Sequence, residues 1–386
     1  MSASTTRPTW DNKRIKHDRV ALLQAEMRRG GVGALYLNGG VTQRYALNLK
    51  VPGCKLFVPV EGEPIAFVRP RDEGLVLAQH ENIRPPLSRA PAGVTSESSA
   101  NSPFARGLID LMAEHGLAGE KLAVDTMAIG QVLDLVKAGV NLVAAEPIIE
   151  RTWTVKTDDE VAIYRVIGDQ YVSTFNAFRD AVRPGVTEKA LAHVVTSTWE
   201  EQDAEDVSQL NVCSAENMNP WRRWPTDRAL QPGDFVGVDL HARGANGLRG
   251  DSSTTFLVGD HASDEQRDLY RRAYDYLQQT IPVWRADRTI ADAMAAVPTV
   301  PERFRKKLWD LNYAHGCGLG SSGYPHMNPR EKPIADTLKH NQVLAIEVYF
   351  GEEGSPLAVK MEQTILVRDG DPELLGPVPL DERWIR

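Results

Sequence analysis

The sequence predicts an α+β protein of two domains, because the order of its helical and strand-like segments changes near residue 148. The 386 residues exceed the length of one usual domain. Alternating helices and strands predict a small α/β domain for residues 1–148. Residues 149–386 instead run as a helix pair, strands, a second helix pair and strands. That order indicates antiparallel sheets that helices cover on one face.

The elements of residues 1–148 follow from periodicity and from the residues that bound them. An amphipathic helix is expected over residues 14–29, because Gly30 and Gly31 end it. Ser102-Pro103 is typical of the start of a helix, which runs to about His115. The other expected elements are strands at 33–37, 54–60, 64–68 and 121–125, a helix at 127–138 and a loop at 84–103.

The elements of residues 149–386 begin with a long helix over residues 156–182. Thr157 is expected to cap it, and acids occupy its first turn. Arg183-Pro184-Gly185 ends this helix, and Thr187-Glu188 begins a second helix that ends near Glu201. A third helix is expected over residues 263–281, with its many charges facing solvent.

Composition and charge exclude several classes of function. The formal charge of −8 leaves no basic stripe for nucleic acid. No apolar run approaches the roughly 18 residues that a membrane span needs, so no membrane partner is expected. The first residues, MSASTTRPTW, lack a secretory hydrophobic segment, and the three cysteines are too scattered for a disulfide framework. We therefore expect a cytoplasmic protein that acts on a small-molecule substrate.

Six potential metal ligands follow one another in the second domain, each in an apolar stretch that resembles a strand or its end. A buried acid without a counter-charge is costly, so acids in such stretches indicate a cation. Oxygen-rich ligands with one or two imidazoles suit a pair of divalent ions such as Mn, Fe, Co or Zn. Four carboxylates would roughly neutralise two such ions. The six residues are Asp239, His241, Asp251, His315, Glu347 and Glu362.

A tryptophan- and arginine-rich motif is the candidate substrate-binding segment. Arg222 and Arg223 could bind a carboxylate through two hydrogen bonds each, and the indoles of Trp221 and Trp224 could hold an onium group by cation–π attraction. Tyr324 and Tyr349 could complete an aromatic cage. An exposed loop or a dimer contact is the alternative interpretation of the same four residues.

These motifs resemble the creatinase/prolidase/methionine aminopeptidase family, whose catalytic domain has the pita-bread fold. The resemblance covers nearly the whole chain and implies a creatinase-like N-terminal domain, a dinuclear metal site and a homodimer. Glu347 and Glu362, fifteen residues apart, match the two glutamate strands that close the family's ligand set. The other matching segments are Lys156, Glu160 and Arg165, PGVTE (184–188), LQPGDFVGVDL (230–240), GLRGDSSTTFLVGD (247–260) and HGCGLG (315–320).

Within that family the sequence is most similar to the dimethylsulfoniopropionate lyase branch, DddP. Asp239-Leu240-His241 stands where that branch has an Asp-x-Asp pair, and His241, like the second aspartate of that pair, lies ten residues before the next ligand, Asp251. EHGLAGEKLAVD (114–125) and MNPWRRW (218–224) are also similar. His241 in place of an aspartate removes one negative charge, which favours imidazole-tolerant Zn, Fe or Co.

The resemblance leaves three functions open. Peptidase members carry a histidine before the first ligand strand, where this chain has Asn219-Pro220-Trp221, and another shortly after HGxG. His326 lies eleven residues past His315, too far for that role unless the loop is longer. We therefore favour a lyase acting on a small onium carboxylate, with Tyr324 and His326 as candidate catalytic residues. A hydrolase of a C–N bond, such as an Xaa-Pro dipeptidase or amidase, and a noncatalytic binding module are the alternatives.

Overall fold

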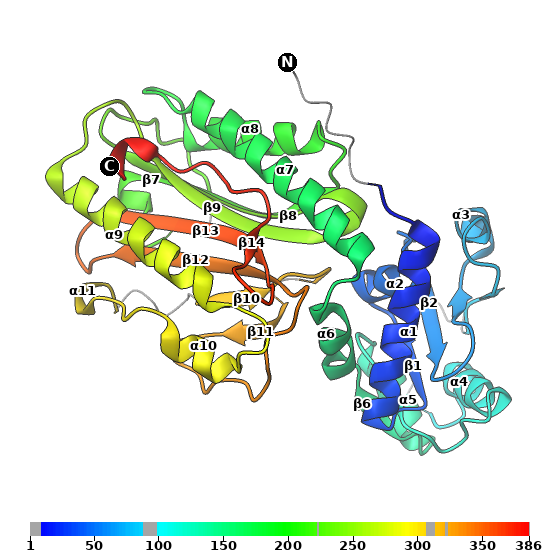
Figure 1. Ribbon diagram of the computed structural model, residues 1–386. Helices are drawn as coiled ribbons and strands as arrows, with labels where there is room; N and C mark the ends of the chain where they lie inside the picture. Colours follow the sequence, from blue (N-terminus) through cyan, green and yellow to red (C-terminus); the bar gives the residue numbers. More distant parts are fainter. Residues whose placement is uncertain (1–8, 88–98, 222–223, 306–312, 321–322, 386) are drawn as a thin grey trace. The chain divides into compact units, whose positions relative to one another are not determined.

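The computed structural model describes residues 9–87, 99–221, 224–305, 313–320 and 323–385. Two compact units divide the chain, Asp11–Trp153 and the unit that contains Thr154–Arg386 (Figure 1). The division falls at the end of helix α6 (Glu146–Thr154), whereas the sequence placed it between residues 148 and 149. Among the described residues, no helix combines the length and apolarity that crossing a bilayer requires.

The N-terminal unit is a mixed sheet of six strands in the order β4-β3-β2-β1-β5-β6. The central strand β1 pairs antiparallel with β2 and parallel with β5, as expected of a small α/β domain. The strands are β1 (Ala34–Leu37), β2 (Lys55–Pro59), β3 (Ile65–Phe67), β4 (Ile83–Arg84), β5 (Leu122–Val124) and β6 (Leu142–Ala144). The helices besides α6 are α1 (Asn12–Gly30), α2 (Gly40–Leu47), α3 (Glu73–Leu77), α4 (Pro103–Glu114) and α5 (Ile129–Lys137).

The helix ends of this unit follow the sequence signals. The side chain of Asp11 accepts hydrogen bonds from two amides of the first turn of α1, and Gly31 ends that helix with a φ of 61°. Ser102 caps α4, with Pro103 in its first turn. These two predicted helices are confirmed, and so is the helix predicted at 127–138, which is α5. The sequence analysis missed α2, which begins after Gly39 without a side-chain cap.

The C-terminal unit is built on one antiparallel sheet of eight strands, in the order β11-β10-β12-β13-β9-β8-β7 with β14 beside β13. The predicted antiparallel sheet is thus confirmed. Its strands are β7 (Asp206–Ser214), β8 (Phe235–Arg243), β9 (Arg249–Leu257), β10 (Ala314–Gly316), β11 (Gly323–Met327), β12 (Val343–Gly351), β13 (Ala358–Leu366) and β14 (Glu373–Leu374). The helices are α7 (Asp158–Ala181), α8 (Glu188–Glu200), α9 (Asp264–Thr280), α10 (Ile290–Ala296) and α11 (Glu302–Arg305).

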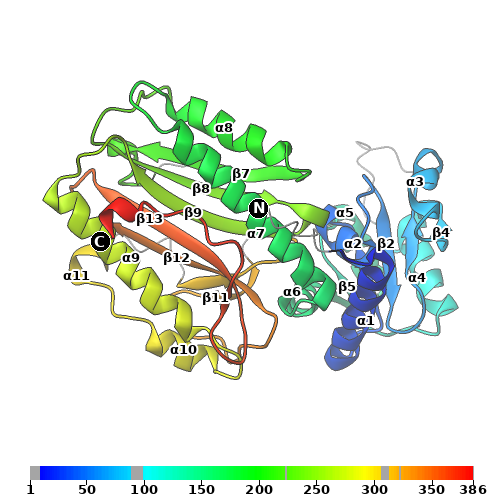
Figure 2. The same ribbon diagram turned by 45° about the horizontal axis from the view of Figure 1, so that its top comes forward.

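Helices α7, α8 and α9 cover this sheet (Figure 2). Thr157 caps α7 in a reciprocal pair with Glu160, which confirms the predicted start of the long helix. Helices α7 and α8 pack near β7 and β9, while α9 packs on β12 and β13. The charged helix predicted over residues 263–281 therefore has one face in the core and the other in solvent.

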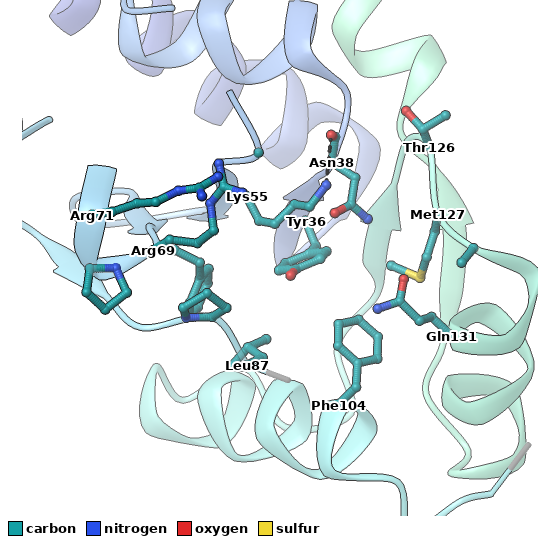
Figure 3. A pocket seen from close by; sticks show the side chains of 15 residues that line it. Tyr36, Asn38, Lys55, Arg69, Arg71, Leu87, Phe104, Thr126, Met127 and Gln131 are labelled. Carbon is teal, nitrogen blue, oxygen red and sulfur yellow. Dashed lines mark hydrogen bonds between the residues drawn. The ribbon is translucent and has the colours of Figure 1, made fainter. Parts of the chain in front are cut away.

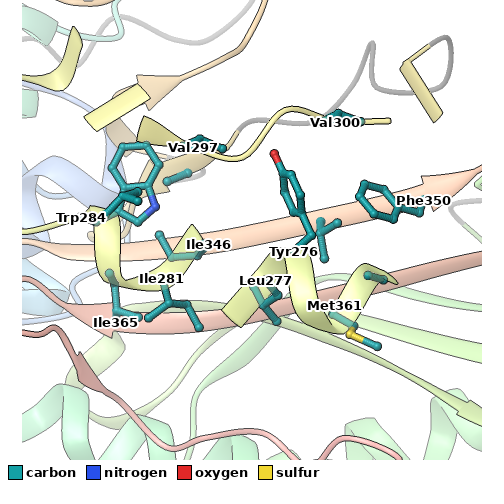
Figure 4. Packing of buried hydrophobic residues seen from close by; sticks show 14 of the residues in the cluster. Tyr276, Leu277, Ile281, Trp284, Val297, Val300, Ile346, Phe350, Met361 and Ile365 are labelled. Carbon is teal, nitrogen blue, oxygen red and sulfur yellow. The ribbon is translucent and has the colours of Figure 1, made fainter. Parts of the chain in front are cut away.

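The core beneath α9 shows which residues of β12 and β13 face α9 and which point to the opposite face of the sheet. Ile346 and Phe350 of β12 and Met361 of β13 pack with Tyr276 and Leu277 of α9 (Figure 4). Successive side chains of a strand point to opposite faces of a sheet. The residues between these apolar positions therefore project from the opposite face, and they include the two predicted glutamate ligands.

Candidate metal centre

The strand registers bring the predicted acids to one level of the sheet. Asp239 of β8 lies opposite Ser253 of β9, and Glu362 of β13 lies opposite the same serine from the other side. Glu362 in turn pairs with Glu347 of β12. Paired residues on neighbouring strands share a face. Three acids from three different strands therefore lie in one row across the sheet, and Ser253 stands between two of them.

The remaining predicted ligands join the same cluster. His241 lies opposite Asp251 in the β8–β9 ladder, and its Nδ1 is 2.7 Å from Asp251 Oδ2. His241 Nε2 is 3.4 Å from Asp239 Oδ1. His315 of β10 places its Nε2 3.5 Å from Asp251 Oδ2 and 3.7 Å from Glu362 Oε1. Five of the six residues are buried, and His241 is nearly so.

Several oxygens of this cluster fit a bound cation. Asp251 Oδ1, Glu362 Oε1 and Asp239 Oδ1 are buried and have no hydrogen-bond partner among the residues that the structure describes. An unsatisfied buried carboxylate oxygen costs free energy unless a cation or proton meets it. Two groups of ligand atoms lie within 4.8 Å of one another: Asp239, His241 and Asp251, and Asp251, His315 and Glu362. Both groups contain imidazole and carboxylate, which suits Mn, Fe, Co or Zn.

A buried lysine that the sequence analysis missed lies inside the same cluster. Lys360 Nζ is 2.8 Å from Asp239 Oδ2, and it lies 3.4 Å from Glu362 Oε2 and 3.5 Å from Glu347 Oε2. The available signal was its position two residues before Glu362, which places both side chains on one face of β13. The count of four carboxylates for two divalent ions therefore omitted one positive charge.

Burial and these neighbours shift the pKa values of the cluster in opposite directions. Burial alone would raise the pKa of Asp239, but the Lys360 ammonium and His241 outweigh it and hold that pKa below its ordinary value. Burial, followed by the charge of Asp251, raises the pKa of Glu362. Burial would lower the pKa of His241, but Asp251 and Asp239 raise it to about 11. Burial and Asp251 thus outweigh the Lys360 ammonium at Glu362, whereas at Asp239 the ammonium and His241 outweigh burial.

Comparison with known proteins identifies the family. The model of metallopeptidase family M24 matches residues 162–369, more than half of the 386 residues. The chain belongs to family M24. This confirms the resemblance on which the ligand set was predicted, and members of the family use divalent metals.

Curated relatives of this M24 protein include lyases and peptidases. Dimethylsulfoniopropionate lyase DddP of Roseovarius nubinhibens is 23% identical over 288 residues, which cover 72% of this chain and 64% of the relative. Methionine aminopeptidase 1 of Bacillus subtilis is 25% identical over 201 residues, which cover 50% of this chain and 79% of the relative. The match thus spans less than two thirds of the lyase's length.

Solved structures confirm the pita-bread fold with its preceding N-terminal domain. An Xaa-Pro dipeptidase from Bacillus anthracis superimposes with a TM-score of 0.78 at 17% identity, covering 95% of this chain and 99% of that one. Aminopeptidase P from E. coli gives a TM-score of 0.74 at 15% identity, covering 98% of each chain. At such low identity the likeness concerns the fold alone.

Trp221 is the one described residue of the tryptophan–arginine motif that lies against the metal face. Its ring packs edge-on against Tyr349, with the centroids 6.2 Å apart, and a side chain at Gly237 would meet it at 3.0 Å. Gly237 precedes Asp239 by two residues and Tyr349 follows Glu347 by two, so this contact lies on the ligand face. The Nε1 of Trp221 is buried without a hydrogen-bond partner among the described residues.

The other members of that motif do not join Trp221. The side chain of Trp224 is 77% exposed, and Arg222 and Arg223 lie outside the described residues. Tyr349 donates its hydroxyl hydrogen to Met218 O at 2.8 Å or Asn219 Oδ1 at 3.2 Å, so it contributes its ring to the site. The aromatic surface beside the ligands therefore consists of Trp221 and Tyr349.

The two candidate catalytic residues lie on β11 and differ in position. His326 pairs with His315 in the β10–β11 ladder, and their rings are 6.4 Å apart. The register thus places His326 next to His315 although eleven residues separate them in the sequence. Tyr324 donates its hydroxyl hydrogen to Asp336 Oδ2 at 2.8 Å. Of the two, His326 is the one that pairs directly with a predicted ligand.

Proposed function

We propose that this M24 protein is a metal-dependent lyase that acts on a small onium carboxylate of the dimethylsulfoniopropionate type. The observation that carries the proposal is the aromatic surface of Trp221 and Tyr349 beside the ligand cluster. Aromatic faces attract onium groups by roughly 0.5–2 kcal/mol. The named DddP relatives support the same reaction class, although the match spans 64% of the length of the first of them.

The residues of the centre would divide the work of an elimination. Asp251, His315 and Glu362 would hold a divalent ion, which supplies stabilisation of negative charge that develops on the substrate carboxylate. Trp221 would hold the onium group. His326 would accept the proton from the carbon next to the carboxylate. The electron pair of that C–H bond forms the double bond as the C–S bond breaks, which releases a neutral thioether and an unsaturated acid.

Hydrolysis of a C–N bond is the second candidate, and the position of His326 favours it. The resemblance to the peptidases implies a proton-shuttling histidine soon after the glycine loop, and the β10–β11 register puts His326 opposite His315. The ion that Asp251, His315 and Glu362 would hold would supply activation of water for attack on an acyl carbon, and His326 would move the proton. Candidate substrates are Xaa-Pro dipeptides and small amides.

A paired assay separates the two candidates. Metal-replete protein is given dimethylsulfoniopropionate, with headspace detection of dimethyl sulfide, beside a panel of Xaa-Pro dipeptides and small amides. The lyase proposal expects dimethyl sulfide and no amide cleavage. Cleavage of the panel without dimethyl sulfide would establish the hydrolase instead, and protein that binds no metal would overturn both. We also propose a homodimer, which light scattering during size-exclusion chromatography tests.

A further inference from the structure

Three carboxylates of the centre already surround a cation that the chain itself supplies. The Lys360 ammonium has three N–H donors, and Asp239, Glu347 and Glu362 each place an oxygen within 3.5 Å of its nitrogen. Lys360 is 5% exposed, and no other lysine or arginine of the described residues forms an ion pair with these three acids. Convergence of several acids on one point is the arrangement expected around a metal ion.

We infer that the Lys360 ammonium replaces one of the two metal ions of the predicted centre, so that the centre holds a single divalent ion. That ion would lie among Asp251, His315 and Glu362, whose ligand atoms lie within 4.8 Å of one another. The inference rests on the metal-dependent function proposed above. It changes the expected number of ions and gives Asp239 a different role.

The hydrogen bonds of Asp239 show that it serves as a counter-ion of Lys360. Its Oδ2 accepts from Lys360 Nζ at 2.8 Å and from Asn211 Nδ2 at 3.0 Å. Asp239 Oδ1 has no hydrogen-bond partner among the described residues, and it lies 3.4 Å from His241 Nε2. Asp251 Oδ1 and Glu362 Oε1 are also without a hydrogen-bond partner in the described part of the chain. Two of these three oxygens thus belong to the acids beside His315, whereas the carboxylate of Asp239 is already engaged by the ammonium through its other oxygen.

The charges lead to the same assignment. Two divalent ions would neutralise all four carboxylates by themselves and leave the buried ammonium without a counter-charge, which is costly. One divalent ion together with Lys360 supplies three positive charges for the four carboxylates and leaves the ammonium paired with Asp239 at 2.8 Å. A centre with one metal ion and one ammonium is thus the better balanced of the two.

Metal stoichiometry tests this inference with the full chain. Elemental analysis after saturation with Mn²⁺ and desalting should give about one ion per chain for the unaltered protein. Lys360→Met removes the charge at similar length and should raise the content to about two, whereas Lys360→Arg should keep it at about one. The Mn²⁺ electron paramagnetic resonance spectrum should show an isolated ion, and a coupled pair only in Lys360→Met.

Each outcome of that experiment has a separate meaning. Two ions in the unaltered protein, or one ion in a folded Lys360→Met variant, would overturn the ammonium inference and leave the proposed metalloenzyme intact. No ion in the unaltered protein would overturn both. Lys360→Gln serves as a second neutral variant if Lys360→Met fails to fold, since its amide can still donate to the surrounding acids, and it should likewise bind about two ions.

A cavity in the N-terminal unit supports a second, independent inference. Its volume is about 960 Å³. It lies at the carboxyl ends of the parallel strands β1 and β5, next to Asn38 and Thr126 (Figure 3). Ligands of open α/β sheets bind outside these strand ends. Its apolar lining includes the clustered rings of Tyr36, Phe67 and Phe104.

The polar lining of this cavity is cationic. Lys55, Arg69 and Arg71 reach it from one side. Asp72 is the one carboxylate that the described residues place against them, 2.8 Å from Arg69 Nε and 3.7 Å from Arg71 Nε. Among the described residues, Lys55 Nζ donates to the carbonyl of Asn38, at 3.3 Å, and to no carboxylate. We propose that the cavity binds a small organic anion with an aromatic or apolar body.

Three probes of one shape test this site by calorimetric titration of the full chain: phenylacetate, phenylacetamide and phenethylamine. Phenylacetate should bind about tenfold or more tightly than the neutral and cationic probes. Lys55→Met should weaken it by about tenfold. Arg106→Ala, which removes a cation from the exposed face of α4 outside the cavity, should leave phenylacetate binding unchanged. Equal binding of the three probes, no binding, or phenylacetate binding that survives Lys55→Met would overturn the proposal. In the last case the anion lies elsewhere, such as at the metal centre.

Discussion

Asp239 and Glu362 face the same serine from neighbouring strands, yet the protein treats these two buried acids in opposite ways. Ser253 lies between them in the sheet. Lys360 and His241 outweigh burial and lower the pKa of Asp239, whereas burial and Asp251 raise the pKa of Glu362. An acid whose counter-charge comes from the chain belongs to the scaffold. Glu362 lies farther from the Lys360 nitrogen, at 3.4 Å, and shares it with two other acids, so it remains available to an external cation.

The largest expected effect is the loss of metal in Glu362→Gln. The amide keeps the shape of the side chain but removes the charge that the ion needs. We expect activity to fall by at least about 100-fold, because even residues that only support ligands contribute ~10–100-fold. Elemental analysis and turnover are measured on the same preparation. Unchanged metal content in this variant would contradict the assignment of Glu362 as a ligand.

Asp239→Asn, in contrast to Glu362→Gln, should have its main effect on the free energy of unfolding and not on metal content. Removing Asp239 leaves the buried Lys360 ammonium short of its nearest counter-charge, 2.8 Å away. Breaking such a pair costs about 3 kcal/mol of unfolding free energy. Glu362→Gln should cost less than about 1 kcal/mol in metal-free protein, because the raised pKa of Glu362 already favours its neutral form. Urea unfolding in the presence of a chelator measures the loss of unfolding free energy in both variants. Equal losses would contradict the different roles assigned to Asp239 and Glu362.

The two tryptophans of the motif should differ in substrate binding. Trp221 packs beside the ligands and Trp224 is exposed. Trp221→Ala should raise KM for an onium substrate by about tenfold, while Trp221→Phe keeps an aromatic face and recovers part of the loss. Trp224→Ala should change KM by less than about twofold. Equal effects of the two alanine variants would place the substrate on the outer loop.

The smallest expected effect concerns Glu373, a partly exposed acid whose pKa, like that of the buried Asp239, is lowered by a cation of the chain. Hydrogen bonds from Arg165, joined by Arg368 and opposed by burial, lower the pKa of Glu373 to about 2. The ordinary value is about 4.3, so its contribution is complete above that pH and is lost as the pH falls toward about 2.

Glu373→Gln should therefore reduce the unfolding free energy at pH 7 by less than about 1 kcal/mol, because solvent screens the pair. The difference from the unaltered protein should vanish near pH 2. Denaturant unfolding across this pH range measures it. A difference that grows as the pH falls would contradict the sign of the shift.

Local sequence signals were sufficient for most elements, and they picked out six residues that the sheet brings into one cluster. Thr157 and Ser102 begin helices as predicted, because capping depends on residues close in the chain. The sequence left the position of His326 relative to His315 open, because strand register decides it, and the β10–β11 pairing sets the two residues opposite each other. Spacing in the sequence alone does not give that register.

Lys360 and the tryptophan motif show a second limit of the sequence. A lysine in a strand is ordinarily expected at the surface, and only the pairing of β13 with β12 and β9 shows that three acids surround this one. Trp221 and Trp224 are equivalent in sequence, but packing against Gly237 separates them. Such distinctions arise from tertiary contacts between distant segments.

The most direct test of the account is the position of metal in crystals grown with Mn²⁺ and measured near its absorption edge. One anomalous peak per chain is predicted, bounded by Asp251, His315 and Glu362, with the Lys360 nitrogen occupying the space beside Asp239. Two peaks, with the second between Asp239 and His241, would contradict the ammonium assignment. The lack of any peak at these residues would contradict the metal centre itself.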